Sequence, residues 1–200
     1  MNTETSLLKA LTESIAGGLS HSLGIEVPPS RVKMPARGAE AGVAVPPGIA
    51  AEKLPVPLGE SFSAVCGVSA IDAVRYENGW LLFTVSEAFF QALIDSAKML
   101  PLPADDGEKL ALNRLLALRR HRGTGCPDRK TVREALWLCA CAAEGRSAVS
   151  RAEKAVLSMF DGVVPKERPA LYDLCGETAD AACRLLNFGY IARKTQRGAK

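Results

Sequence analysis

Cysteine and histidine are the residue types best suited to metal binding or nucleophilic chemistry, and this 200-residue chain holds six cysteines and two histidines. No two cysteines form a C-x-x-C pair, whereas zinc sites usually draw four ligands from two close pairs. We therefore interpret all six as reduced, partly buried thiols and predict neither a metal nor a cofactor. The six are Cys66, Cys126, Cys139, Cys141, Cys175 and Cys183. His21 lies in a helical pattern, and His121 stands among arginines that oppose its protonation.

The short motifs of common catalytic sites are also missing. The sequence contains no phosphate-binding G-x-x-x-x-G-K-[ST] loop and no G-x-S-x-G nucleophile turn. The acid pair Asp105-Asp106 lies in a connector containing proline and glycine, where we expect it to solvate the chain. We therefore predict that the protein is not an enzyme. The alternative, an enzyme, would require a deep pocket that joins His121 to a carboxylate.

Positive charge gathers in the second half of the chain. Residues 1–108 carry a net charge of −6, whereas residues 109–200 carry a net charge of +9. The planar guanidinium of arginine binds phosphate oxygens and stacks on bases, so the basic half is the part expected to meet a polyanion. The alternative is that these cations only cover exposed helix faces. The candidate RNA-binding residues are Arg114, Arg119, Arg120, Arg122, Arg129, Lys130, Arg133, Arg193, Lys194 and Arg197.

Trp137 is an aromatic residue close to these cations. It falls outside the main apolar stripe of its expected helix, which leaves two interpretations. The indole is either a platform for a stacked base or a side chain packed against a neighbouring helix.

The elements expected in the first half are a helix, a proline-rich loop, a hairpin and a second helix. Residues 6–23 have the apolar spacing of a helix that Gly24 closes, and the seven prolines of residues 26–60 exclude a long helix there. Residues 31–34 suit a short edge strand. Strand formers at 70–76 and 80–85 flank Asn78-Gly79, which favours a type I′ turn. Ser86 then caps a helix over 87–100. Its expected inward residues are Ala88, Phe89, Ala92, Leu93 and either Ala97 or Met99.

The second half has the pattern of four helices with short links. They are expected at 108–121, from Thr131 to 144 with Gly145 as the stop, from Ser150 to 160, and at 169–187. Thr131 with Glu134 and Ser150 with Glu153 suggest capping boxes. We therefore predict an α+β protein: a small N-terminal α/β unit with a β-hairpin over residues 1–103, followed by a C-terminal α-helical bundle over residues 108–200.

The helical half resembles the DALR-type anticodon-binding domain found at the C-terminus of arginyl-tRNA synthetases. That family's first helix carries a stretch close to Tyr-Ala-x-Ala-Arg-x-x-Ser-Ile-x-Arg, and residues 110–120 align with it. The positions that fit are Ala111, Arg114, Leu118 and Arg120, whereas Leu110 and Ala117 replace the family's tyrosine and serine. Residues 169–174 and Ala181-Ala182 are similar to the family's last helix.

The first half is similar to the additional N-terminal domain of the same enzymes. Residues 79–90 align with the family's Gly-Phe-Ile-Asn-Phe-x-Leu-Ser stretch and the helix after it, whereas the Gly-Asp-x-x-x-Asn signature is missing. Only residues 102–107 join the two halves, and neither the His-Ile-Gly-His nor the Lys-Met-Ser-Lys-Ser element of the catalytic domain occurs. The resemblance therefore implies a protein that cannot activate arginine by the mechanism of that family.

Together these patterns predict a non-catalytic, synthetase-related protein that binds tRNA or another structured RNA through its basic helical half. The alternative is a protein-interaction or regulatory module on the same scaffold that has lost RNA binding, with a protein partner or a second copy of itself. Glu4 stands where a secretory signal needs positive charge, and no apolar run approaches the ~20 residues that cross a bilayer. We therefore expect a cytoplasmic location and no membrane partner.

Overall fold

The computed structural model describes residues 6–36, 42–46, 68–100 and 129–159, together with residues 178, 181–182 and 184–186. The chain divides into two compact units, Met1–Ala92 and Leu93–Lys200, and each is described by itself. The expected linker at 102–107 lies outside the described residues. The domain bounds 1–103 and 108–200 therefore stay predictions. In its described part the chain combines helices with a three-stranded antiparallel sheet, which agrees with the α+β class in general.

Helix α1 spans Leu7–Leu23 and has the ends that the sequence predicts. The Ser6 side chain accepts a hydrogen bond from the Lys9 backbone N–H at 3.1 Å, and Gly24 follows the helix with φ of 62°. Serine is favoured before the first turn of a helix because its hydroxyl accepts a hydrogen bond from a free backbone N–H. Glycine is favoured after the last turn because it adopts positive φ without strain. Of the predicted apolar stripe, Leu8, Leu11, Ile15 and Leu19 are buried, with at most 2% of each side chain exposed. Leu7, also predicted for this stripe, is half-buried.

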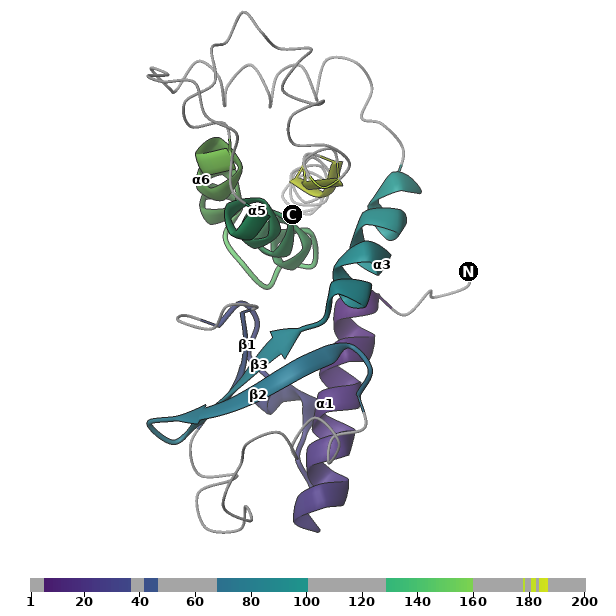
Figure 1. Cartoon of the computed structure of the whole chain (residues 1–200), viewed down its shortest axis with the longest axis vertical. Helices are drawn as coiled ribbons and strands as arrows, with labels where there is room; N and C mark the ends of the chain where they lie inside the picture. The colour runs from purple at the N-terminus through teal and green to yellow at the C-terminus, as the bar shows by residue number, and fades with distance from the viewer. Residues whose placement is uncertain are drawn as a thin grey trace, which may run out of the picture. The chain divides into compact units, whose positions relative to one another are not determined.

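The predicted hairpin is confirmed. Strand β2 spans Ile71–Glu77 and strand β3 spans Trp80–Val85, and the two pair antiparallel with a bulge near Ile71. Between them Asn78 and Gly79 have φ of 50° and 82°, as the two central residues of a type I′ turn require. Strand β1, Val43–Val45, pairs antiparallel with the other side of β3, so the sheet order is β1-β3-β2 (Figure 1).

The two faces of this sheet differ. Alternate residues Leu81, Phe83 and Val85 are at most 3% exposed and form one buried face of the sheet. Helix α1 runs across the back of the sheet in Figure 1. Trp80 and Leu82 project from the opposite face. The strand expected at 31–34 is wrong, because Pro29–Arg31 form a turn of 3₁₀ helix and a single bridge joins Lys33 to Ala44. Proline suits the first turn of such a helix, since its φ is already fixed.

Helix α3 spans Glu87–Lys98, and the Ser86 hydroxyl accepts a hydrogen bond from the Phe89 N–H at 3.2 Å, as predicted. Phe89, Leu93 and Ala97 are buried as expected. Ala88 was expected to point inward and is exposed, whereas Ala92 is half-buried. Of the two alternatives at the end of the helix, Ala97 is the buried one and Met99 is exposed. Phe90 and Ile94 are buried instead, because the buried stripe contains the adjacent pairs 89–90 and 93–94.

Helices α5, Arg129–Ala143, and α6, Val149–Met159, contact one another in the second unit (Figure 1). The prediction that Gly145 ends the first of them is confirmed. Gly145 has φ of 75°, its N–H donates to the Ala142 carbonyl, and the Arg146 N–H donates to the Cys141 carbonyl. This pair of bonds is the Schellman motif.

The predicted capping boxes of these two helices are wrong. Helix α5 begins at Arg129 and α6 at Val149, so Thr131 and Ser150 lie within the first turns rather than before them. The helix expected at 108–121 lies outside the described residues. Of the one expected at 169–187, residues 178, 181–182 and 184–186 are helical, and Ala181, Ala182 and Leu186 are buried.

Candidate nucleic-acid interface

The first turns of α5 carry three of the predicted RNA-binding residues. Arg129 is the first residue of the helix, Lys130 is exposed, and Arg133 is half-buried. Glu134 follows on the same side of the helix as Lys130, four positions on, and is exposed. The other predicted RNA-binding residues lie outside the described residues and stay predictions. They are Arg114, Arg119, Arg120, Arg122, Arg193, Lys194 and Arg197.

Between α5 and α6 lies a hollow of about 320 Å³, called here the α5–α6 hollow. Its lining residues are Glu134 and Leu138 from α5 with Arg151, Lys154, Ala155 and Ser158 from α6. On α6 the three polar residues are spaced by three and four positions, which places them on one side of the helix. Arg151 and Lys154 are exposed, and Ser158 and Ala155 are half-buried.

The cations of this hollow differ from other arginines of the unit. Arg146 Nε lies 2.9 Å from a carboxylate oxygen of Glu144, and Arg184 Nη1 donates to the Leu100 carbonyl at 3.3 Å. By contrast, Arg151 and Lys154 form no ion pair with any carboxylate in the part of the chain that the structure describes. Their charge is therefore available to an anion from solution.

Trp137 packs inside the second unit. It is 3% exposed, and every residue from Ala135 to Ala142 is buried along with it. A helix segment that is buried all round presents no side chain to solvent, so Trp137 cannot serve as a platform for a stacked base. Of the two interpretations of this residue, packing against neighbouring elements is confirmed.

Cys139 and Cys141 are free thiols and both are fully buried, in agreement with the prediction for these two positions. Burial raises the pKa of the Cys141 thiol from 9.0 to about 12, because an apolar environment disfavours the thiolate. The other four cysteines lie outside the described residues. Among the residues that the structure describes, no three His, Cys, Asp or Glu side chains gather as metal ligands.

We expect Cys141 to resist alkylation in the folded protein. At pH 8 its thiolate population should be about a thousandfold lower than after unfolding, since the pKa is raised by about three units on folding. The measurement is the iodoacetamide labelling rate of the peptide containing Cys141, by mass spectrometry, with and without denaturant. Equal rates in the two conditions would contradict the burial of this thiol.

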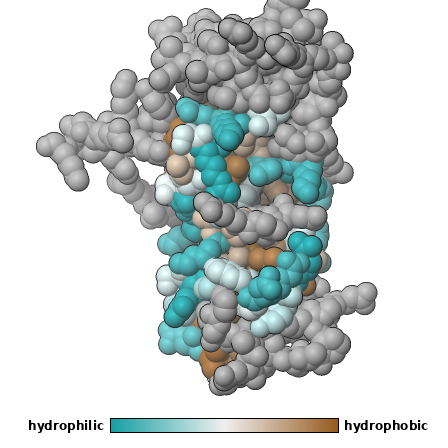
Figure 2. Space-filling view, turned by 90° about the vertical axis from the view of Figure 1, so that its left-hand side faces the viewer, coloured by the Kyte–Doolittle hydropathy of each residue, from teal (hydrophilic) through white to brown (hydrophobic). Residues whose placement is uncertain are grey.

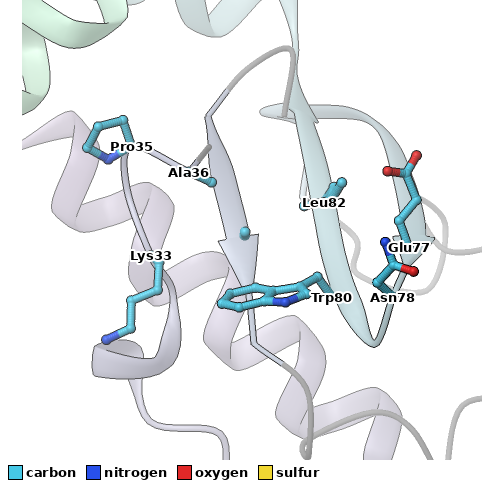
Figure 3. Close-up of a pocket in the computed structure, with 8 residues that line it drawn as sticks. Lys33, Pro35, Ala36, Glu77, Asn78, Trp80 and Leu82 are labelled. Carbon is cyan, nitrogen blue, oxygen red and sulfur yellow. The ribbon is translucent and has the colours of Figure 1, made fainter. Parts of the chain in front are cut away.

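A second hollow, of about 500 Å³, lies on the face of the sheet opposite α1 and is called here the sheet hollow. Its lining residues are Lys33, Pro35, Ala36, Ala44, Glu77, Asn78, Trp80 and Leu82. Figure 3 shows the Trp80 indole beside β1, with Asn78 and Glu77 at the hairpin end and Lys33 on the other side of the strand. The Lys33 ammonium donates to the Ser30 carbonyl at 2.9 Å, and Arg75 Nε lies 3.8 Å from Glu77 Oε1.

Trp80 is also one of the few large apolar side chains on the described surface. It is 38% exposed, and Tyr76 and Met99 are the other exposed large apolar residues among those described. On the face seen in Figure 2, apolar areas in the described part are small and are separated by hydrophilic residues. The sheet hollow is therefore the place where an exposed aromatic ring and a concave surface coincide.

Arg151 and Lys154 are functional candidates that the sequence analysis missed. Each stands in an ordinary helical pattern with acids nearby, such as Glu153, so neither belongs to an acid-free cluster. The signal available was their spacing of three positions on a predicted helix, which places two cations side by side.

Comparisons with known proteins identify no matching family, no similar curated protein and no similar solved structure. Among the described helices, none combines the length and the apolar character that a membrane crossing requires.

Proposed function

We propose that the protein binds tRNA or another structured RNA through its basic second half and catalyses no reaction. In this proposal residues 108–200 form a DALR-like helical bundle and residues 1–103 resemble the additional domain of arginyl-tRNA synthetases. The protein acts in the cytoplasm as a binding protein.

The observation that carries this proposal is a pair of exposed cations beside the α5–α6 hollow, Arg151 and Lys154, which form no ion pair with a carboxylate among the described residues. Lys130 is exposed on α5 as well, and the second half of the chain has a net charge of +9. Phosphate groups release condensed counterions when lysine and arginine neutralise them, so such a surface gains free energy from a nucleic-acid backbone. The same contacts position an RNA without selecting its sequence.

The test is an equilibrium titration of the full chain with total tRNA at two salt concentrations. If about five phosphates are contacted, the logarithm of the affinity should fall with a slope of about 4 against the logarithm of salt. A threefold rise in salt should then weaken binding by about a hundredfold. Absence of binding at low salt would overturn the proposal.

A second candidate function, binding of a protein partner, is favoured by Trp80 and the sheet hollow. Tryptophan is enriched among the residues that contribute most to protein interfaces, and this one is exposed at a concave surface. The partner is either another protein or a second copy of this chain.

This candidate function is tested with Trp80→Ala, and Tyr76→Ala is the matched control. Tyr76 is similarly exposed, but it pairs with Leu81 and so belongs to the opposite face of the hairpin. Light scattering and quantitative co-purification should show a complex that Trp80→Ala weakens and Tyr76→Ala leaves intact. A complex that survives Trp80→Ala would exclude the sheet hollow as the interface.

A further inference from the structure

We propose that the α5–α6 hollow binds one nucleotide unit of an RNA strand and distinguishes ribose from deoxyribose. Arg151 and Lys154 hold the phosphate, and Glu134 accepts a hydrogen bond from the ribose 2′-hydroxyl. This inference rests on the proposed RNA-binding function and adds the chemical class of strand that the hollow selects.

The residues of α6 in this hollow suit a phosphate group. Arg151 and Lys154 lie three positions apart on one side of the helix, and neither forms an ion pair with a carboxylate in the described part of the chain. The Ser158 hydroxyl donates to the Lys154 carbonyl at 3.0 Å. Its proton is therefore engaged within the helix, and phosphate oxygens in the hollow are left to the two cations.

Helix α5 contributes an acidic residue that suits a sugar hydroxyl. Glu134 is an exposed carboxylate that lines the same hollow, although a site made only for phosphate would be better without an acid. An ionised carboxylate can only accept hydrogen bonds, so it repels a phosphate and attracts a hydroxyl. The 2′-hydroxyl is the group by which a protein tells RNA from DNA. With deoxyribose the repulsion would remain and the hydrogen bond would be lost.

The hollow also has apolar lining residues, which suit contact with a sugar ring. Leu138 is 4% exposed and Ala155 is half-buried, so both offer apolar contact surface. The volume of about 320 Å³ is at the small end of the range of ligand sites, ~300–1,000 Å³. One nucleotide unit is thus the occupant that matches the size of the hollow, its two neighbouring cations and the carboxylate of Glu134 together.

The experiment compares the dissociation constants of the full chain for a single-stranded RNA and a DNA of the same sequence, at ~0.1 M salt. Arg151→Ala and Lys154→Ala should each weaken binding to both strands by about threefold to tenfold, because phosphate contacts are shared by RNA and DNA. Glu134→Ala should instead lower the preference for RNA over DNA by about fivefold.

The matched control is Glu153→Ala. Glu153 is a half-buried acid on α6 that does not line the hollow, so its removal changes the net charge by the same amount. Circular dichroism of each variant reports whether the helices are retained. An RNA preference that falls equally in Glu134→Ala and Glu153→Ala would overturn the inference, as would RNA binding indifferent to Arg151→Ala and Lys154→Ala. The first result leaves the proposed function standing, whereas the second removes the two cations that carry it. A wild-type chain that binds no RNA removes both proposals.

Discussion

Reversing the charge of Arg151 and Lys154 together, in an Arg151→Glu/Lys154→Glu variant, should weaken tRNA binding by about a hundredfold at ~0.1 M salt. Each substitution removes one phosphate contact and adds a carboxylate that repels the backbone. Because two contacts are lost, the slope of affinity against salt should also fall by about 1.5 to 2. The measurement is fluorescence anisotropy with labelled tRNA over a series of salt concentrations.

The control for this variant is Lys9→Glu/Arg31→Glu, which changes the net charge by the same amount in the first unit. Both residues are exposed, and Lys9 is engaged only in a surface ion pair with Glu13 at 3.9 Å. Such pairs contribute little to stability. We expect the control to bind tRNA with a loss of no more than a few-fold. Equal losses in the two double variants would show that overall charge, and not the α5–α6 hollow, governs the affinity.

Phe83→Ala should destabilise the first unit by about 3–5 kcal/mol, the usual cost of truncating a buried phenylalanine. Phe83 is 1% exposed on the central strand β3, where it pairs with Val43 of β1 and Val74 of β2. Its removal leaves a void that both neighbouring strands and the stripe of α1 must tolerate, so the loss acts on the whole unit. Urea unfolding followed by tryptophan fluorescence measures the effect, since Trp80 lies on the same strand.

Tyr76→Ala is the control for this variant as well. Tyr76 is 40% exposed on β2 of the same hairpin, so its truncation should cost far less than that of Phe83. If Phe83→Ala unfolds at the same urea concentration as the wild type, the core assigned to this sheet would be wrong.

Local signals were sufficient to predict several elements of this protein. Ser6 and Gly24 bound α1, Asn78-Gly79 form the hairpin turn, and Gly145 ends α5, as expected from the sequence. Each of these features depends on a few consecutive residues, because a side-chain oxygen or a permitted positive φ acts on the adjacent backbone. The inward residues of α3 depend on which side of the helix is covered, and there the prediction for Ala88 was wrong.

The candidate site required more than local signals. Lys130 and Arg133 were predicted from the clustering of cations in the sequence, whereas Arg151 and Lys154 were not. The difference lies in Glu134, which is close to Lys130 in sequence but lines one hollow with Arg151 and Lys154 only because α5 packs on α6. The spacing of residues along one helix does not predict a hollow that two helices form together.

The sequence by itself determined where α1 begins and ends, how the hairpin turns, and that positive charge belongs to the second half of the chain. These properties follow from backbone preferences and from residue counts, which need no tertiary contacts. Only the tertiary structure decided that Trp137 is buried and that two cations of α6 share a hollow with a carboxylate of α5. The physical reason is that burial and the sharing of a site depend on which surfaces cover one another, and residues distant in the sequence supply those surfaces.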